Sequence, residues 1–142
     1  MAKINTGRMI LCGLLAGLVI NIGEIILNVV ILAEDWEDAS ESVGLAASEG
    51  TGMIFWYIIL GFLLGITGVW IYAAIRPRYG AGPRTALFAG STVWFLTYFL
   101  GFSWPFFNGW FPMYLFWWTM IWGFVEINLA MVIGARFYAE EG

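Results

Sequence analysis

The chain has 142 residues, of which 61% are hydrophobic and 11% charged, and its formal net charge is −4. In a typical soluble domain about a quarter of the residues are charged. A water-soluble fold of this size could not bury this much apolar surface, so it is excluded. The small net charge and the lack of a basic stripe also argue against a nucleic-acid partner.

The sequence lacks the residue types that most cofactors require. It contains no histidine, one cysteine (Cys12) and one lysine (Lys3). These counts exclude an internal disulfide, a CxxC pair, histidine ligation of haem or zinc, and a lysine Schiff base inside a membrane. We therefore expect no cofactor and no metal. We also expect no enzymatic activity, because no nucleophile stands beside a base.

Four apolar segments are long enough to cross about 30 Å of hydrocarbon as helices. The first, at about residues 9–32, is too long for a signal-peptide core and precedes no cleavage pattern, so we expect it to be retained. The second lies at about 53–75, the third at about 85–102 and the fourth at about 112–137. Between the second and third, RPRYGAGPR predicts a tight turn in which Pro77 lies outside the helices and Pro83 begins the next one. The predicted fold is an all-α, single-domain bundle of four transmembrane helices over residues 1–142.

Basic residues predict the orientation of the bundle. Lys3 and Arg8 precede the first span, three arginines lie between the second and third, and Arg136 ends the fourth. The connections at 33–52 and 103–111 contain none. Because the cytoplasmic side carries the excess of Lys and Arg, both termini are predicted to be cytoplasmic in a bacterial inner membrane.

Aromatic and acidic residues gather near the span ends. We expect the aromatic rings at the level of the lipid headgroups; the alternative is a docking surface for a partner protein or a pigment. The residues concerned are Trp56, Tyr57, Trp70, Tyr72, Tyr79, Trp104, Trp110, Tyr114, Trp117, Trp118 and Tyr138.

The segment 34–50 holds six of the ten acids. We read it as a solvated connection with a short helix anchored by Trp36, Val43 and Leu45, or alternatively as a negative vestibule that concentrates cations.

Small and polar residues form one stripe along each span, as expected where helices approach closely in a bilayer. At 100° per residue each stripe covers an arc of about 60–80°. The glycines expected at helix contacts are Gly13, Gly17, Gly61, Gly65, Gly68, Gly90 and Gly123. The other stripe members are Asn21, Glu24 and Asn28 in the first span, Tyr57 and Tyr72 in the second, Ala86, Thr97 and Gly101 in the third, and Thr119, Glu126, Ala130 and Gly134 in the fourth.

Two carboxylates in these stripes need a further explanation. A charged acid near the bilayer centre costs about 2.5–3.5 kcal/mol on insertion scales. Glu24 and Glu126 are predicted to reach the same layer of the bundle, with no Lys or Arg at that depth. This leaves a protonated carboxyl, two carboxyls sharing one proton, or a bound cation. The candidate site is Asn21, Glu24, Asn28, Thr119 and Glu126, acting as interhelical polar contacts, as a proton or cation relay, or in coordination of a cofactor or metal.

Asn128 lies on the opposite side of its helix from Glu126, so it faces another helix, a partner subunit or lipid. A carboxamide that faces lipid is costly, and Asn128 is therefore a candidate partner contact.

The expected partners are membrane lipids and other membrane subunits or further copies of the chain. The expected function is a non-catalytic accessory or scaffolding subunit of a larger membrane complex. The alternative is a small proton- or cation-coupled transporter or channel that uses Glu24 and Glu126.

A resemblance rests on three segments, GRMILCGLLAGLVINIGEIILN, EDW and WIYAAIRPRYGAGPRTA. They resemble a family of small four-helix bacterial integral membrane proteins of the domain-of-unknown-function type, which implies a membrane location and no particular activity. A glutamate in the first of four spans is also similar to the small multidrug resistance transporters. The long acidic connection, the charge asymmetry and the second glutamate depart from that pattern, so their mechanism is not carried over.

Overall fold

The computed structural model describes residues 3–45 and 51–140, and over these residues the chain is helical with no strand. Four helical segments are long and apolar enough to cross a membrane: Thr6–Ile31, Gly52–Tyr79, Pro83–Phe107 and Met113–Phe137. This confirms the prediction of an all-helical chain with four apolar spans. The elements in chain order are α1 (Thr6–Ile25), η1 (Ile26–Ile31), α2 (Ala33–Ser42), α3 (Thr51–Tyr79), α4 (Pro83–Trp94), η2 (Phe95–Leu100), α5 (Trp104–Phe107) and α6 (Met113–Phe137).

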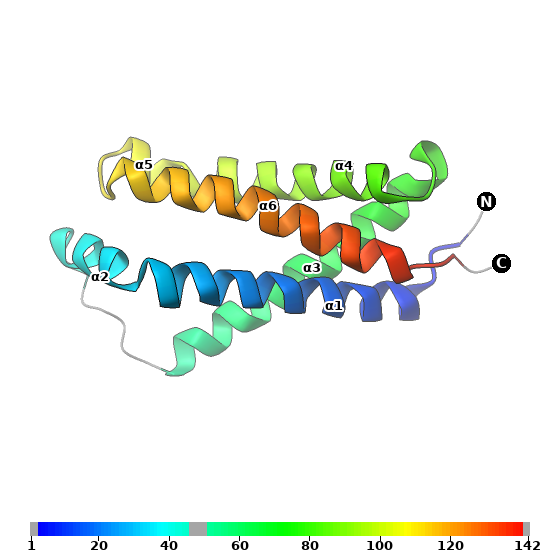
Figure 1. The fold of residues 1–142 in the computed structure, drawn as a ribbon, viewed down its shortest axis with the longest axis horizontal. Coiled ribbons are helices and arrows are strands. Elements are labelled where there is room, and N and C mark those ends of the chain that lie inside the picture. The colour runs from blue at the N-terminus through cyan, green and yellow to red at the C-terminus, as the bar shows by residue number, and fades with distance from the viewer. Residues whose placement is uncertain (1–2, 46–50, 141–142) are drawn as a thin grey trace.

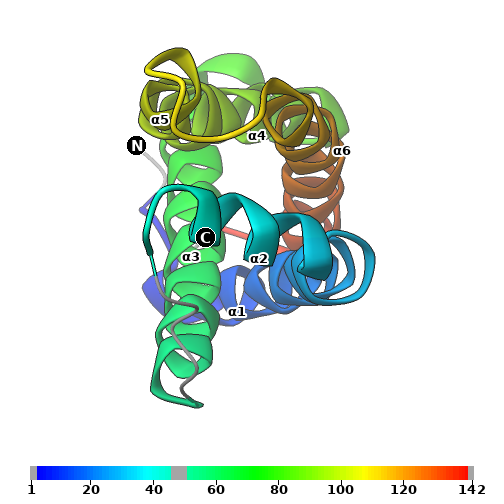
Figure 2. The ribbon, with the colours of Figure 1, turned by 90° about the vertical axis from the view of Figure 1, so that its left-hand side faces the viewer.

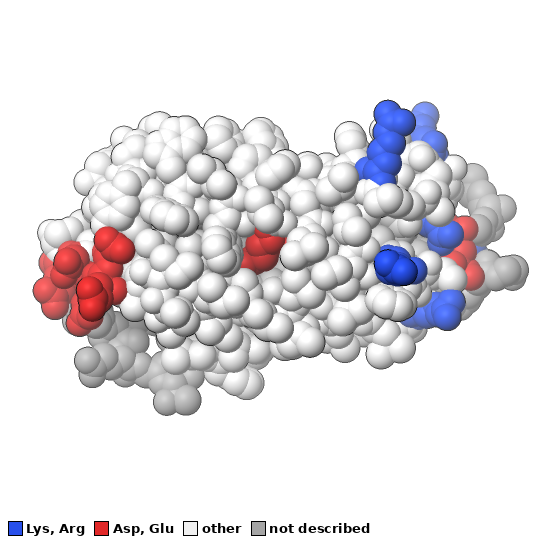
Figure 3. All heavy atoms as spheres, in the orientation of Figure 1, with Lys and Arg blue, Asp and Glu red and all other residues white. Residues whose placement is uncertain are grey.

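The long helices run between two chemically different ends. The chain termini lie at one end, and α2 and α5 lie at the other (Figure 1). In the end-on view of Figure 2, α3 runs beside α1 and reaches α4, while α6 connects the α1 and α4 sides. Figure 3 shows basic residues gathered at the terminal end and a cluster of acids at the α2 end. The separation of charge along the long axis is thus a property of the folded chain.

Glycines allow α1 and α3 to touch backbone to backbone. A Cβ atom added at Gly13 would lie 2.5 Å from the Cα of Ile66, and one added at Gly17 would lie 2.7 Å from the Cα of Phe62. A Cβ on Gly65 would overlap the backbone of Gly17 and of Gly13. Because backbone atoms cannot rotate away, a larger residue at these positions would force the two helices apart. The other predicted contact glycines also meet neighbouring helices, at Asn21 (Gly61), Met131 (Gly68), Asn128 (Gly90) and Tyr98 (Gly123).

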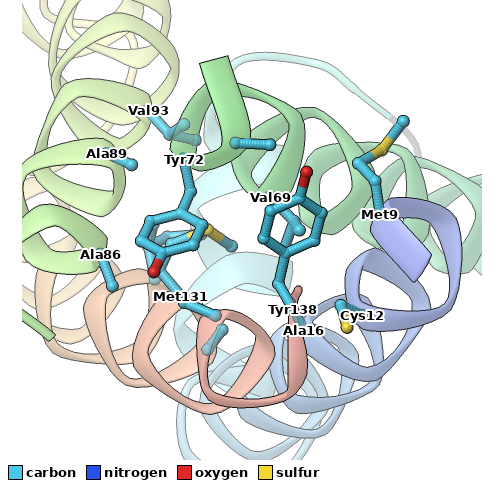
Figure 4. Packing of buried hydrophobic residues seen from close by; sticks show 14 of the residues in the cluster. Met9, Cys12, Ala16, Val69, Tyr72, Ala86, Ala89, Val93, Met131 and Tyr138 are labelled. Atoms are coloured by element: carbon cyan, nitrogen blue, oxygen red, sulfur yellow. The ribbon is translucent and has the colours of Figure 1, made fainter. Parts of the chain in front are cut away.

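Two of the rings expected near the inner ends of the spans are buried in the core of the bundle. Tyr72 and Tyr138 are 2% and 5% exposed, and their rings meet edge to face with centroids 6.0 Å apart (Figure 4). Tyr138 follows the last turn of α6, and burial raises the pKa of its phenol above the ordinary value. A hydropathy window gives only the depth of a residue along its span, and this pair is buried because the end of α6 packs against α3.

The turn between the second and third spans is shorter than predicted. Helix α3 continues through Pro77 to Tyr79, so the expectation that Pro77 lies outside the helices is wrong. A proline removes one amide hydrogen from the helix, but the following turn still closes, since the Gly80 amide donates to the Arg76 carbonyl at 2.8 Å. The helix ends where Gly80 and Gly82 take positive φ values of 86° and 126°, which glycine adopts at little cost.

The acidic connection contains the short helix expected of it. In α2, Ala39 is buried, and Trp36 packs edge to face on Phe102, Phe106 and Phe111. Trp36 therefore joins α2 to the segment around α5. Val43 and Leu45, which were expected to anchor the connection, are exposed; residues 46–50 lie outside the described residues.

Candidate functional site

Glu24 and Glu126 meet inside the bundle, bridged by the hydroxyl of Tyr98. Glu24 is near the end of α1, Glu126 is in the middle of α6 and Tyr98 is in η2. The Tyr98 hydroxyl donates to Oε1 of Glu24 and lies 3.4 Å from Oε1 of Glu126. Glu126 is only 5% exposed, and Glu24 is half-buried. Three titratable oxygen groups from three elements are thus connected in series.

Amide and indole groups complete this cluster. Asn28 in η1 donates to Oε2 of Glu24 at 2.5 Å and to the Glu24 carbonyl at 3.1 Å. Its own Oδ1 accepts from the indole of Trp36 at 2.9 Å. On the other carboxylate, the indole of Trp122 donates to Oε2 of Glu126 at 3.1 Å. The cluster consists of Glu24, Asn28, Trp36, Tyr98, Trp122 and Glu126, and we refer to it as the carboxylate cluster.

Two glycines make room for the cluster. A Cβ at Gly23 would overlap the carboxyl group of Glu126, and a Cβ at Gly123 would overlap the ring of Tyr98. Gly123 was expected to lie at a helix contact. Gly23 lies outside the predicted stripe, and its contact becomes visible only when α6 is placed against α1.

Tyr98 was not predicted, because η2 breaks the helical phase on which the prediction depends. The stripe drawn at 100° per residue places Thr97 and Gly101 on the inner face. Both are exposed, and the Thr97 hydroxyl returns to its own helix at the Val93 carbonyl, 2.8 Å away. From Phe95 onward the backbone is a π-helix, whose wider turns rotate the following side chains relative to an α-helix. Tyr98 therefore points inward in place of Thr97.

The remaining candidates from the first and fourth spans lie apart from the carboxylate cluster. Asn21 donates to the carbonyl of Ile58 at 3.1 Å and so contributes to the α1–α3 contact. Thr119 is 8% exposed, and its hydroxyl has no hydrogen-bond partner among the described residues. Of the polar residues expected around the two acids, only Asn28 bonds to one of them.

Asn128 is satisfied within the chain. It is 6% exposed, its amide donates to the Phe124 carbonyl at 2.8 Å, and its Oδ1 accepts from Ser91 of α4 at 3.3 Å. Gly90 provides the space, since a Cβ there would lie 2.8 Å from the Asn128 Oδ1. Asn128 faces another helix of the same chain, so it gives no support for a partner subunit.

No cation accompanies the two acids in the part of the chain that the structure describes. The ion pair found among the described residues joins Arg76 to Glu140 at the terminal end, away from Glu24 and Glu126. Figure 3 shows acidic atoms about halfway along the molecule, where that face carries no basic residue. Within residues 3–45 and 51–140 there is also no group of three or more His, Cys, Asp or Glu side chains that could hold a metal ion.

The geometry suits the movement of one proton. If Glu126 carries a proton, its carboxyl can donate to the Tyr98 oxygen while the Tyr98 hydroxyl donates to ionised Glu24. Transfer along both hydrogen bonds then leaves Glu126 ionised, Tyr98 unchanged and Glu24 protonated. One proton moves between two helices with no net change in the charge of the cluster.

No protein-family model, curated protein or solved structure matches this chain.

Proposed function

We propose that this chain is a small proton-coupled transporter or channel that binds and relays a proton at the carboxylate cluster. The observation that carries the proposal is the Tyr98 hydroxyl, held between a carboxylate of α1 and a carboxylate of α6. Polar contacts between helices need only a donor and an acceptor, and an amide serves as well. Two acids around one hydroxyl add a titratable site where charge is costly, which is typical of proton pathways in membranes.

The proposed orientation places both termini in the cytoplasm of a bacterial cell, with the chain in the inner membrane. It is supported by the basic residues at the terminal end and by the acids of α2 at the other end (Figure 3). In this orientation the hydrogen bonds from Trp36 to Asn28 and from Asn28 to Glu24 extend the carboxylate cluster from Glu24 to helix α2 at the acidic end. The acids of α2 raise the local concentration of cations, including protons, at that end.

Proton flux into liposomes tests the proposal. Purified protein is reconstituted, a pH gradient or a membrane potential is applied, and an internal pH dye is followed. We expect flux in the wild type and its loss in Tyr98→Phe, which removes the bridging hydroxyl and keeps the ring. Thr97→Val is the matched control, because it removes the adjacent hydroxyl, which bonds only to its own helix. Flux that Tyr98→Phe leaves intact would contradict the relay, and flux carried by sodium at constant pH would assign the site to a metal cation.

A second candidate function is an accessory subunit of a larger membrane complex. The observation that favours it is the start of α3, where four consecutive side chains are all outward-facing: Ile54, Phe55, Trp56 and Tyr57 are 58–64% exposed. Four consecutive residues cover every side of a helix, and this part of α3 projects away from the other long helices (Figure 1). Purification from native membranes after mild crosslinking tests it: a stable partner lost in Trp56→Ser supports it, and a chain recovered alone contradicts it.

A further inference from the structure

A cavity of about 500 Å³ opens at the terminal end of the bundle, far from the carboxylate cluster. It lies where the last turn of α3, the start of α4 and the end of α6 meet. Its polar lining includes Arg76, Arg136, Tyr72 and Tyr138, and Gly82 with Pro83 closes it from the α4 side. Two arginines from different helices therefore face one space at the level where the spans end.

Arg76 contributes a guanidinium group to the lining of this cavity. Its Nη1 atom is buried and forms an ion pair with Glu140 at 3.6 Å, which is too long for a hydrogen bond. Among the described residues this nitrogen has no hydrogen-bond partner. The guanidinium is held over the ring of Tyr138, 5.5 Å from its centroid. A guanidinium has five N–H donors in a fixed plane, so Arg76 is positioned to bind a further anionic oxygen.

The start of α4 adds positive potential to the same space. Pro83 is the first residue of the helix, and Gly82 before it provides no side-chain acceptor for the amides of the first turn. An uncapped helix N-terminus carries about half a positive charge and is a common position for phosphate groups. The Gly82 amide donates to the Tyr72 hydroxyl at 3.1 Å, which fixes this turn against α3.

We propose that this cavity binds a phosphate ester through Arg76, Arg136 and the N-terminus of α4. The volume exceeds what a halide needs, and paired arginines match the several oxygens of a phosphate. Val132 and Ala135 provide an apolar wall on the α6 side. The same chemistry is offered by the headgroup of an anionic phospholipid and by a free phosphate compound. Basic pockets between transmembrane helices at a cytoplasmic surface suit lipid headgroups in particular.

Binding to the purified full-length protein in a neutral detergent tests the proposal and separates the two sources. One arm titrates phosphatidylglycerol, with phosphatidylcholine as the uncharged comparison, and counts bound lipid by native mass spectrometry. The other arm titrates inorganic phosphate and glycerol phosphate by calorimetry. We expect Arg76→Gln and Arg136→Gln each to weaken binding about tenfold, the lower end of the range for loss of one hydrogen bond to a charged group. Binding only in the first arm assigns the site to lipid, and binding in the second assigns it to a soluble phosphate.

The control is Arg8→Gln, which removes the same charge at the same end from a residue that does not line the cavity. Arg76→Lys keeps the charge if Arg76→Gln fails to fold. Arg136→Gln remains usable in that case because Arg136 is exposed and forms no ion pair within the described residues. Equal weakening by Arg8→Gln, or no binding in either arm, would overturn the proposal. Because the readout is binding and not flux, the result does not depend on the proton relay.

Discussion

Gly123 of α6 lies directly against the ring of Tyr98. A Cβ at position 123 would lie 2.5 Å from Cδ1 of that ring. The position of the bridging hydroxyl therefore depends on a glycine, which has no functional group in its side chain. A substitution at Gly123 can thus move Tyr98 without changing any titratable group.

Gly123→Ala is expected to displace Tyr98 and abolish the proton flux while leaving Glu24, Tyr98 and Glu126 in the sequence. The ring must shift because the methyl group occupies its place. Gly101→Ala is the control, since a Cβ there makes only an ordinary contact, 3.5 Å from the Leu96 carbonyl. Flux measured in liposomes for both variants decides the matter, and full activity in Gly123→Ala would show that the observed ring position is not needed.

Glu24→Gln is expected to fold normally and lose flux, whereas Glu24→Leu is expected to lose stability as well. Glutamine keeps one of the two oxygens, so Tyr98 retains its acceptor, and Asn28 retains its bond to the backbone carbonyl of residue 24, but glutamine cannot carry the proton. Leucine removes both oxygens, so Tyr98 and Asn28 each lose a hydrogen bond, and a buried donor left without an acceptor costs about 1–3 kcal/mol. Thermal unfolding in detergent gives the stability. If Glu24→Gln keeps full flux while Glu24→Leu unfolds, the residue is only a polar contact between helices.

Infrared difference spectra check the protonation of the cluster directly. We expect one proton to be held by the two carboxyls at neutral pH, because both share one hydroxyl and no Lys or Arg of the described residues pairs with either. A protonated carboxyl stretch should disappear in Glu24→Gln or in Glu126→Gln. Two carboxylates that both remain ionised down to about pH 5, near the values of model compounds, would show that water reaches them freely.

Alanine at Gly13 or Gly17 is expected to lower the stability of the bundle by about 1–3 kcal/mol, the usual cost of overpacking. The added Cβ would meet the backbone of α3, which cannot rotate away. Gly7→Ala in the first turn of α1 is the control, because a Cβ there would make only an ordinary contact with the described residues, 3.8 Å from Oδ1 of Asn5. Equal melting temperatures for the three variants would mean that α1 and α3 are further apart than described.

The orientation predicts which residues react with a membrane-impermeant maleimide in intact cells. In a Cys12→Ser background, Glu37→Cys on α2 should react from outside, and Arg78→Cys should react only after permeabilisation. Both positions are exposed, so accessibility to the reagent depends only on the side of the membrane. The reverse pattern would invert the topology, and a reporter fused after Gly142 that works only in the periplasm would do the same.

The four spans, the contact glycines and the charge at the two ends follow from the sequence alone, because hydrocarbon thickness and the cost of charge in lipid restrict the possible arrangements so strongly. Composition and a helical wheel also bring Glu24 and Glu126 to related faces. Only the tertiary structure shows that the two acids meet, since this depends on the sliding and rotation of α6 against α1. Tyr98 joins them because a π-helical segment changes the phase that the wheel assumes constant. Asn128, placed opposite Glu126 by the wheel, meets α4 of the same chain, because a wheel gives a direction and only packing decides what lies there.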